Sequence, residues 1–155
     1  MNGLRAAVGG LGFSLAGFMS LVAWEGYRET AYIPVPGDVP TVGIGTTEGV
    51  KLGDKVTPLQ AIQRAARDVS KFEGAIKQCV KVPLAQYEYD AYTLLSYNIG
   101  THAFCTSTLV RKLNAGDYEG ACKEILRWNR FQGEVLQGLV NRRQHEYQLC
   151  KGERA

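Results

Sequence analysis

The feature of this sequence that most constrains its fold is an uncharged run near the N-terminus, Ala6 to Trp24. Its nineteen residues would form a helix about 28 Å long, close to the roughly 30 Å hydrocarbon core of a bilayer. Four glycines, four alanines and two serines fill ten of these positions, however, and such residues add little to membrane insertion. The run is therefore expected to form a helix that is only marginally stable in lipid.

Three interpretations of this run are open: a cleaved signal peptide, a permanently buried core helix, and an uncleaved membrane anchor that later leaves the bilayer. Cleavage before Trp24 would leave Glu25 at a frayed new N-terminus, where its side chain could not be held in place. A core helix would leave the uncharged length unexplained. We favour the releasable anchor. The single flanking charge, Arg5, favours a cytoplasmic N-terminus and export of the remainder.

Length and charge indicate one ordinary globular domain, since 155 residues are enough to bury a self-sufficient core. The net charge of +3 is small and evenly scattered, so no nucleic acid partner is expected, although an anionic polymer would attract the chain. The two histidines, His102 and His145, lie far apart and are not spaced as ligands, so we expect no catalytic metal.

Four cysteines lie far apart in the sequence and form no CxxC motif, which excludes a zinc ribbon and a thioredoxin-like motif. Their even number favours two disulfides and an oxidising compartment, such as a bacterial periplasm or the outside of a cell. Four free buried thiols in a cytosolic protein are the alternative. The cysteines are Cys79, Cys105, Cys122 and Cys150.

Turn residues and hydrophobic periodicity predict a mostly helical α+β domain with one small sheet. Three prolines and a glycine in residues 31–40 exclude a helix, and residues 41–46 alternate as a strand does, so we expect a hairpin or small sheet around 31–52. The first helix after it has an apolar stripe that includes Leu59 and Ile62. The helices are expected at about 57–78, 83–100, 107–115, 117–128 and 135–149.

Carboxylates and a hydroxyl crowd into the segment that follows the uncharged run. Cleavage of a glycosidic bond needs one acid to protonate the leaving oxygen and one carboxylate to activate water. Glu25 at the helix end and Asp38 in the loop are candidates for these roles, and Thr41 could orient the water. Glu25 could equally be a solvated helix-end charge, and Asp38 an ordinary turn aspartate. Three other acids look equally available: Glu29, Glu48 and Asp54.

The segment EGYRETAYIPVPGDVPTVGIGTT, residues 25–47, resembles the active-site segment of phage-type lysozymes, the endolysins of glycoside hydrolase family 24. The likeness continues in LLSYNIG (94–100), FCTSTLVRKLNAGDYEGAC (104–122) and GLVNRRQHEYQLC (138–150). It implies a lysozyme-like single domain that hydrolyses the β-1,4 bond between N-acetylmuramic acid and N-acetylglucosamine of peptidoglycan and so lyses the host cell. No metal or organic cofactor is implied, and a monomer is expected.

The resemblance also implies a catalytic set. In the family, a Glu, an Asp and a Thr before an apolar-Gly-apolar-Gly strand form it, and these match Glu25, Asp38 and Thr41. Twelve residues separate Glu25 from Asp38 and two separate Asp38 from Thr41, a different division of almost the usual total span. Pro34 stands where the family commonly has its Asp, so Asp38 is the natural substitute.

Two supporting features follow from the same resemblance. In related enzymes an arginine of the late helix pairs with the catalytic Glu, which indicates Arg142 here, with Arg143 as the second choice. Either could instead be a solvated helix charge. The expected disulfides are Cys79–Cys105 and Cys122–Cys150, one of three possible pairings.

The uncharged run resembles the signal-arrest-release segment of a subgroup of these endolysins, which are exported uncleaved, held inactive in the inner membrane and freed when the membrane potential collapses. This implies an anchor at residues 1–24 that becomes part of the first helix, and a catalytic domain at 25–155. The protein would be tethered to the inner membrane of the host and then be soluble in the periplasm. The run has no cysteine, so the disulfides should be structural.

Two alternatives to a hydrolase are open. A lytic transglycosylase would act on the same bond with one acid and leave a 1,6-anhydro product. A membrane-anchored wall-binding module would have no activity, so replacing Glu25 would change nothing.

Overall fold

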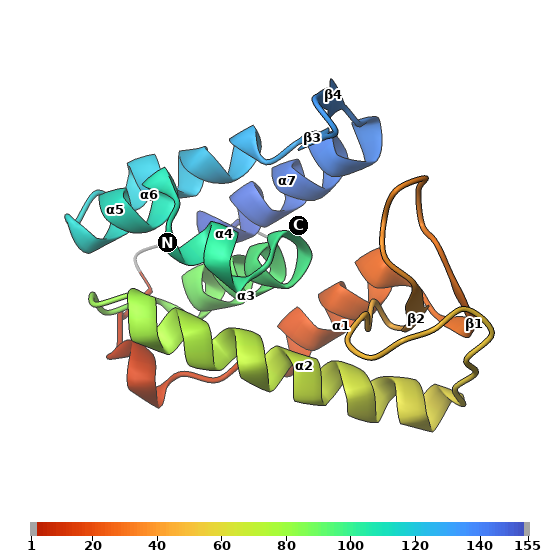
Figure 1. Cartoon of the computed structure of the whole chain (residues 1–155). Helices are drawn as coiled ribbons and strands as arrows, with labels where there is room; N and C mark the ends of the chain where they lie inside the picture. The colour runs from red at the N-terminus through yellow and green to blue at the C-terminus, as the bar shows by residue number, and fades with distance from the viewer. Residues whose placement is uncertain (1–2, 154–155) are drawn as a thin grey trace. The chain divides into compact units, whose positions relative to one another are not determined.

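The computed structural model describes residues 3–153, which form two compact units. The unit called here the sheet unit is residues 18–71, and the helical unit combines residues 3–17 with 72–153. Both boundaries fall within helices, α1 (Leu15–Glu25) and α2 (Pro58–Cys79), which are labelled in Figure 1. Each unit has its own buried apolar cluster.

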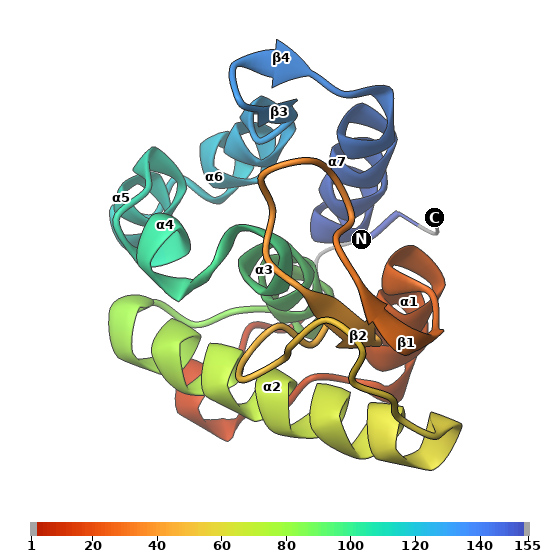
Figure 2. The same ribbon diagram turned by 45° about the vertical axis from the view of Figure 1, so that its right-hand side comes forward.

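A two-stranded antiparallel sheet organises the sheet unit. Its strands are β1 (Arg28–Tyr32) and β2 (Thr41–Gly43), joined by a long loop that is visible in Figure 2. The opposite edge of β1 shares backbone hydrogen bonds of 2.8 and 2.9 Å with residues 54–56. The buried cluster of this unit consists of Ala31, Val42, Ile44, Val50, Val56, Ala61 and Ala65, with Phe18 and Val22 packed against it.

Helix α2 begins where the sequence predicts, because Thr57 and Gln60 cap its first turn reciprocally. Thr57 Oγ1 accepts from Gln60 N at 3.2 Å, and Gln60 Oε1 accepts from Thr57 N at 2.9 Å. Pro58 occupies the first helical position, where no N–H is needed.

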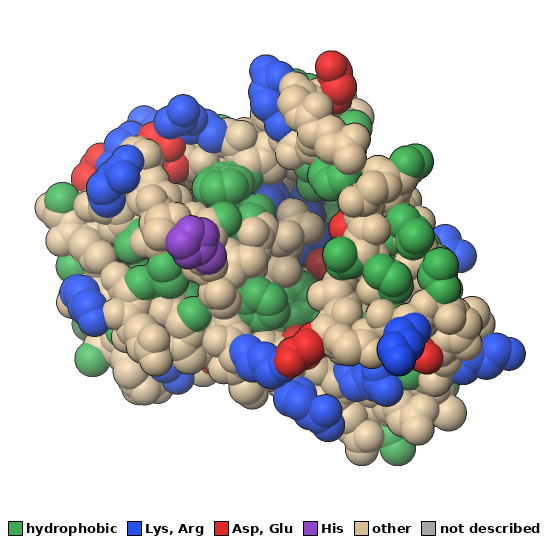
Figure 3. Space-filling model, viewed as in Figure 1, with side chains coloured by type: hydrophobic (Ala, Val, Ile, Leu, Met, Phe, Trp, Pro, Cys, Tyr) green, Lys and Arg blue, Asp and Glu red, His purple; other side chains and the backbone are tan. Residues whose placement is uncertain are grey.

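Figure 3 shows Lys and Arg side chains, with acidic groups among them, gathered over α2 and the segment after β2.

The apolar stripe predicted for α2 is wrong in its first two turns. Leu59 and Ile62 are 65% and 46% exposed, whereas Ala61 and Ala65 are fully buried. The cause is the close approach of β2, since a Cβ placed on Gly43 would lie 2.9 Å from Ala61 Cβ. The helix therefore presents its smallest side chains to the strand, a constraint that hydrophobic periodicity does not contain.

Helix α3 (Gln86–Ile99) is the centre of the helical unit, and all its residues from 88 to 97 are buried. Figure 1 shows the later helices of this unit around α3. They are α4 (Thr101–Cys105), α5 (Thr108–Asn114), α6 (Tyr118–Glu124), the 3-10 turn η2 (Ile125–Arg127) and α7 (Gln137–Cys150).

Two of these helices begin where the sequence predicts, each at a capping side chain. Ser107 Oγ accepts from Val110 N at 3.2 Å at the start of α5, and Asp117 Oδ1 accepts from Gly120 N at 2.8 Å at the start of α6. The helix predicted at 117–128 ends earlier, as α6 followed by η2.

A short hairpin that the sequence does not predict precedes α7. Its strands are β3 (Arg130–Phe131) and β4 (Glu134–Val135), paired antiparallel. The turn between them has φ of +49° at Gln132 and +86° at Gly133, as a two-residue type I′ turn requires. The predicted class, mostly helical α+β with a small antiparallel sheet, is confirmed, with this second sheet added.

Residues 3–14 are not helical apart from the 3-10 turn η1 (Val8–Gly10). The sequence predicts one helix over 6–24, and only its second part, from Leu15, is helical in this structure. Glycine costs roughly 1 kcal/mol in a helix, and three of the four glycines of the run lie before Leu15. Ala6 instead shares backbone hydrogen bonds of 2.8 and 2.9 Å with Leu84.

None of the helices within residues 3–153 is both long enough and apolar enough to cross a bilayer.

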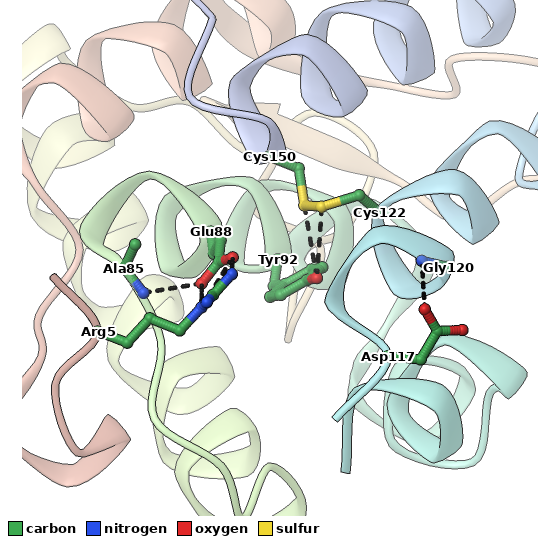
Figure 4. Close-up of a disulfide and its surroundings, with 8 residues drawn as sticks. All are labelled: Arg5, Ala85, Glu88, Tyr92, Asp117, Gly120, Cys122 and Cys150. Atoms are coloured by element: carbon green, nitrogen blue, oxygen red, sulfur yellow. Dashed lines mark hydrogen bonds and ion pairs between the residues drawn. A yellow bond between two sulfur atoms is a disulfide. The ribbon is translucent and has the colours of Figure 1, made fainter. Parts of the chain in front are cut away.

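Two disulfides cross-link the helical unit, Cys79–Cys105 and Cys122–Cys150. This is the pairing that the resemblance implies, and no cysteine is left free. Figure 4 shows the second disulfide beside Tyr92, whose hydroxyl lies 3.4 Å from Cys150 Sγ. The cross-links close loops between residues 26 and 28 positions apart in the sequence.

Candidate active site

Glu25 is the last residue of α1, and the chain leaves the helix at Gly26, whose φ of +68° suits a glycine. Gly26 N donates a backbone hydrogen bond of 2.9 Å to Val22 O and closes the last turn. The side chain of Glu25 is half-buried, and its Oε1 atom is shielded from solvent. The predicted acid is therefore fixed at a helix end and partly desolvated.

Asp38 lies in the loop between β1 and β2, where a tight turn fixes its backbone. Asp38 N donates a hydrogen bond of 3.0 Å to Val35 O. Pro36 and Gly37, the latter with φ of +88°, occupy the central positions, as in a type II turn. The Pro/Gly composition of the loop thus determines where this carboxylate lies.

Val39 connects Asp38 to Thr41. Its N–H donates to Asp38 Oδ1 at 2.8 Å, and its carbonyl accepts from Thr41 Oγ1 at 3.2 Å. Asp38 is half-buried, and Thr41 is 7% exposed. The second carboxylate and the hydroxyl are therefore held by the same backbone residue.

Strands β1 and β2 connect Asp38 and Thr41 to Glu25. Thr41 opens β2 and pairs with Tyr32 of β1, and β1 itself begins at Arg28, three positions after Glu25. The three predicted residues accordingly lie on successive elements of the sheet unit: the end of α1, the loop after β1, and the start of β2.

Arg142, the predicted supporting residue, lies on α7 in the helical unit. Its side chain is 6% exposed, and its Nε donates a hydrogen bond of 3.2 Å to Glu146 Oε1. Arg143 is fully buried and pairs with the same carboxylate, with Nη2 2.9 Å from Oε1 and Nε 2.9 Å from Oε2. Neither arginine is a solvated helix charge, so that alternative is wrong.

The histidines lie apart on α4 and α7. His102 is exposed, while burial and the nearby charge of Arg142 lower the pKa of His145 below its ordinary 6.5. No group of three or more His, Cys, Asp or Glu side chains in the described part of the chain is placed to hold a metal ion.

One supporting contact was not predicted from the sequence. Thr46, 4% exposed, shares backbone hydrogen bonds of 2.9 and 3.1 Å with Val42, and its Oγ1 donates to Asp68 Oδ2 of α2 at 2.7 Å. This contact anchors the turn after β2, in which Gly43 and Gly45 both have positive φ. The two glycines are the only sequence signal of that turn.

Residues 22–146, which include every candidate residue above, match the family described as phage lysozyme. The chain belongs to the phage lysozyme family. The SAR-endolysin of Pseudomonas phage phiKMV is 42% identical to it over 151 residues, covering 95% of this chain and 90% of that protein.

Two solved structures resemble this member of the family. The endolysin of Escherichia coli O157:H7 phage FAHEc1 has a TM-score of 0.80 and 33% identity, covering 95% of this chain and 96% of that one. The muramidase domain of SpmX from Asticaccaulis excentricus has a TM-score of 0.81 and 30% identity, covering 90% and 97%. The predicted enzyme class and function are confirmed: the protein is a lysozyme, a glycoside hydrolase of host-cell lysis whose substrate is peptidoglycan.

Proposed function

We propose that Glu25 is the general acid of this lysozyme, that Asp38 assists the attacking water, and that Thr41 orients it. The bond cleaved is the β-1,4 bond between N-acetylmuramic acid and N-acetylglucosamine. The observation that carries the proposal is the Val39 bridge, because it holds one carboxylate and one hydroxyl together in the unit that also contains Glu25.

The hydroxyl of Thr41 suits the orienting role. It donates its proton to Val39 O, so its lone pairs remain as acceptors for a water proton. A water held in this way directs its own lone pair at the anomeric carbon. Asp38 keeps one carboxylate oxygen on Val39 N and offers the other to the water.

The reaction then follows from these placements. Glu25 gives its proton to the glycosidic oxygen, the bond from that oxygen to the anomeric carbon of the muramic acid breaks, and N-acetylglucosamine leaves with a 4-hydroxyl. Water adds to the anomeric carbon. One of its protons stays on the new hydroxyl group, and the other passes to a carboxylate. The products are two glycan ends, one of them a reducing muramic acid.

Mass spectrometry of the products from purified peptidoglycan tests this reaction. We expect every new muramic acid end to be reducing and to carry oxygen-18 when the digest is made in labelled water. Unlabelled 1,6-anhydro ends would show a lytic transglycosylase instead and would overturn the proposed water attack.

We also propose that residues 1–24 first anchor the protein in the inner membrane of the host, and that residues 25–155 form the catalytic domain, released into the periplasm as a monomer. The SAR-endolysin name of the phiKMV relative and the uncharged run support this. A sedimentation experiment on the released protein tests the monomer.

The contacts of residues 5–14 give the proposal a physical basis. Arg5 makes an ion pair with the buried carboxylate of Glu88 (2.7 Å), Phe13 N donates to Glu73 Oε1 (2.7 Å), and Ser14 N donates to Asp90 Oδ1 (3.0 Å). Arg5 and Glu88 are drawn in Figure 4. Contacts of this kind form only when the segment has left the bilayer, so they would hold the released state.

Cell fractionation tests the anchor. Full-length protein should divide between membrane and soluble pools, with activity in the soluble pool. Glu88→Gln should shift the protein toward the membrane pool, because Arg5 loses its charged partner. Glu119→Gln, on an exposed pair with Lys123, is the matched control and should leave the division unchanged. A processed N-terminus, or equal specific activity in both pools, would contradict the anchor.

A further inference from the structure

The sheet unit has a second polar site, formed by α2 and the segment after β2. It is a pocket of about 470 Å³ on the same unit as the proposed catalytic residues. The side chains that give it its character are Thr46, Glu48, Arg64, Arg67, Asp68 and Lys71. Nothing in the proposed hydrolysis uses them.

The inner part of this pocket is fixed by Thr46 and Asp68. The hydroxyl of Thr46 is buried and donates to one carboxylate oxygen of Asp68, so the turn after β2 is held against α2. Asp68 therefore fixes the shape of the pocket, and with Glu48 it offsets two of the three positive charges of Arg64, Arg67 and Lys71.

The outer part of the pocket is cationic. Lys71 forms an ion pair with Glu48. The hydrogen bond from Lys71, and then the charges of Lys71 and Arg67, lower the pKa of the Glu48 carboxyl. The guanidinium groups of Arg64 and Arg67 donate no hydrogen bond to any other residue within 3–153. Two guanidinium groups on successive turns of one helix thus remain available to a ligand, and guanidinium favours carboxylate or phosphate through paired hydrogen bonds.

We propose that this pocket binds a carboxylate of the peptide stem that peptidoglycan carries on its muramic acid. The inference rests on the proposed function, and it adds a substrate group recognised outside the glycan. Arg64 and Arg67 would hold the carboxylate, and Lys71 would join them when Glu48 moves aside.

The position of the pocket suits this ligand. Thr46 pairs through its backbone with Val42, the residue after Thr41, so the pocket begins next to the strand that carries the water-orienting hydroxyl. The stem is attached to the sugar whose anomeric carbon is attacked. A four-residue peptide spans about 14 Å when extended, which is enough to carry its carboxylates away from the reacting bond.

Glu48 competes with such a ligand for the same cations. Its side chain is 73% exposed and that of Lys71 is 51% exposed, so their ion pair opens at little cost in water. Removing this negative charge should therefore strengthen binding of the stem, whereas removing the arginines should weaken it.

The test compares two substrates: intact peptidoglycan, and the same glycan strands after an amidase has removed the stems. The readout is the ratio of kcat/KM on the two. In Arg64→Gln/Arg67→Gln we expect the preference for intact peptidoglycan to fall about tenfold, equivalent to about 1.4 kcal/mol. In Glu48→Gln we expect it to rise.

Lys51→Gln/Lys55→Gln is the matched control, since it removes two exposed charges from the same unit outside the pocket. It should leave the ratio unchanged. An equal fall of kcat/KM on both substrates in the arginine variant, or a control effect as large as that of the arginines, would overturn the proposal. Thermal unfolding of each variant excludes a folding defect.

A wild-type protein that cleaves neither substrate would contradict the proposed catalytic function and would leave the pocket to be judged by binding alone. For that purpose the stems released by the amidase are titrated into the full chain and followed by NMR. Shifts at Arg64, Arg67 and Thr46 in the wild type, with the Thr46 shift lost in Arg64→Gln/Arg67→Gln, support the pocket. No shift at any of the three residues overturns it.

Discussion

Arg143 is the largest fully buried side chain in the described part of the chain, and Glu146 carries the opposing charge. Both side chains are 0% exposed, and Arg142 donates to the same carboxylate. Removing one partner of such a group leaves a buried charge without compensation. These residues are therefore expected to contribute strongly to folding, whatever Arg142 adds to catalysis.

Glu146→Gln tests that expectation. It should lower the free energy of unfolding by about 3–5 kcal/mol, measured by urea denaturation. The control, Glu119→Gln, removes an exposed carboxylate paired with Lys123 and should have no measurable effect. Equal effects of the two variants would contradict the assignment of stability to the buried group.

The partly buried His145 should make the free energy of unfolding depend on pH. Burial, and then the charge of Arg142, lower its pKa from 6.5 in the folded protein, so the unfolded chain binds the proton more readily. The stability that this histidine contributes is complete above about pH 6.5 and is lost as the pH falls toward the lowered folded value. His145→Gln should therefore show a shallower fall of the free energy of unfolding below pH 6.5. An identical pH profile for both proteins would contradict this.

Helix α2 and strand β2 meet at Gly43, which both elements require. Its φ of +66° disfavours any side chain, and a Cβ there would lie 2.9 Å from Ala61 Cβ. Gly43→Ala should cost about 2–5 kcal/mol, from backbone strain together with overpacking. Gly53→Ala, with φ of +93° and no atom within 4 Å of the added Cβ, should show only the backbone part. Equal melting temperatures would contradict the packing argument.

The helices and strands show which features of the fold the sequence could predict. The caps at Thr57, Ser107 and Asp117 are local hydrogen bonds within three residues, so their residue types are enough to indicate them. The buried face of α2 depends on a strand that approaches it from elsewhere in the chain. The hairpin before α7 has strands of two residues, too short for alternation to be recognised.

The candidate site also has residues that the sequence indicates and contacts that depend on the folded structure. Glu25, Asp38 and Thr41 stand out in the sequence as carboxylates and a hydroxyl that follow the uncharged run, and the resemblance to phage-type lysozymes implies the same three residues. The bridge through Val39 depends on the conformation of one loop, and Thr46 reaches Asp68 across 22 positions. The first contact is local but requires one particular loop conformation, and the second joins distant parts of the chain, so residue types alone indicate neither.

At the scale of the whole molecule, the disulfides make the stability of the enzyme depend on an oxidising environment. Both lie in the helical unit and close loops of similar length. Replacing Cys122 and Cys150 by serine should lower the free energy of unfolding by about 2–4 kcal/mol. Denaturation with and without a reductant checks this, because the reductant should destabilise the wild type more than the variant. An equal effect of the reductant on both would contradict it.

The central claim concerns Glu25, because the proposed chemistry and the proposed anchor both meet at the end of α1. The most direct measurement is the rate of release of soluble fragments from purified peptidoglycan by wild type, Glu25→Gln and Asp38→Asn, each with a matching circular dichroism spectrum and melting temperature. We predict that Glu25→Gln loses about 100-fold or more of the activity while remaining folded, and that Asp38→Asn loses less. A folded Glu25→Gln protein that lyses peptidoglycan at the wild-type rate would contradict the account.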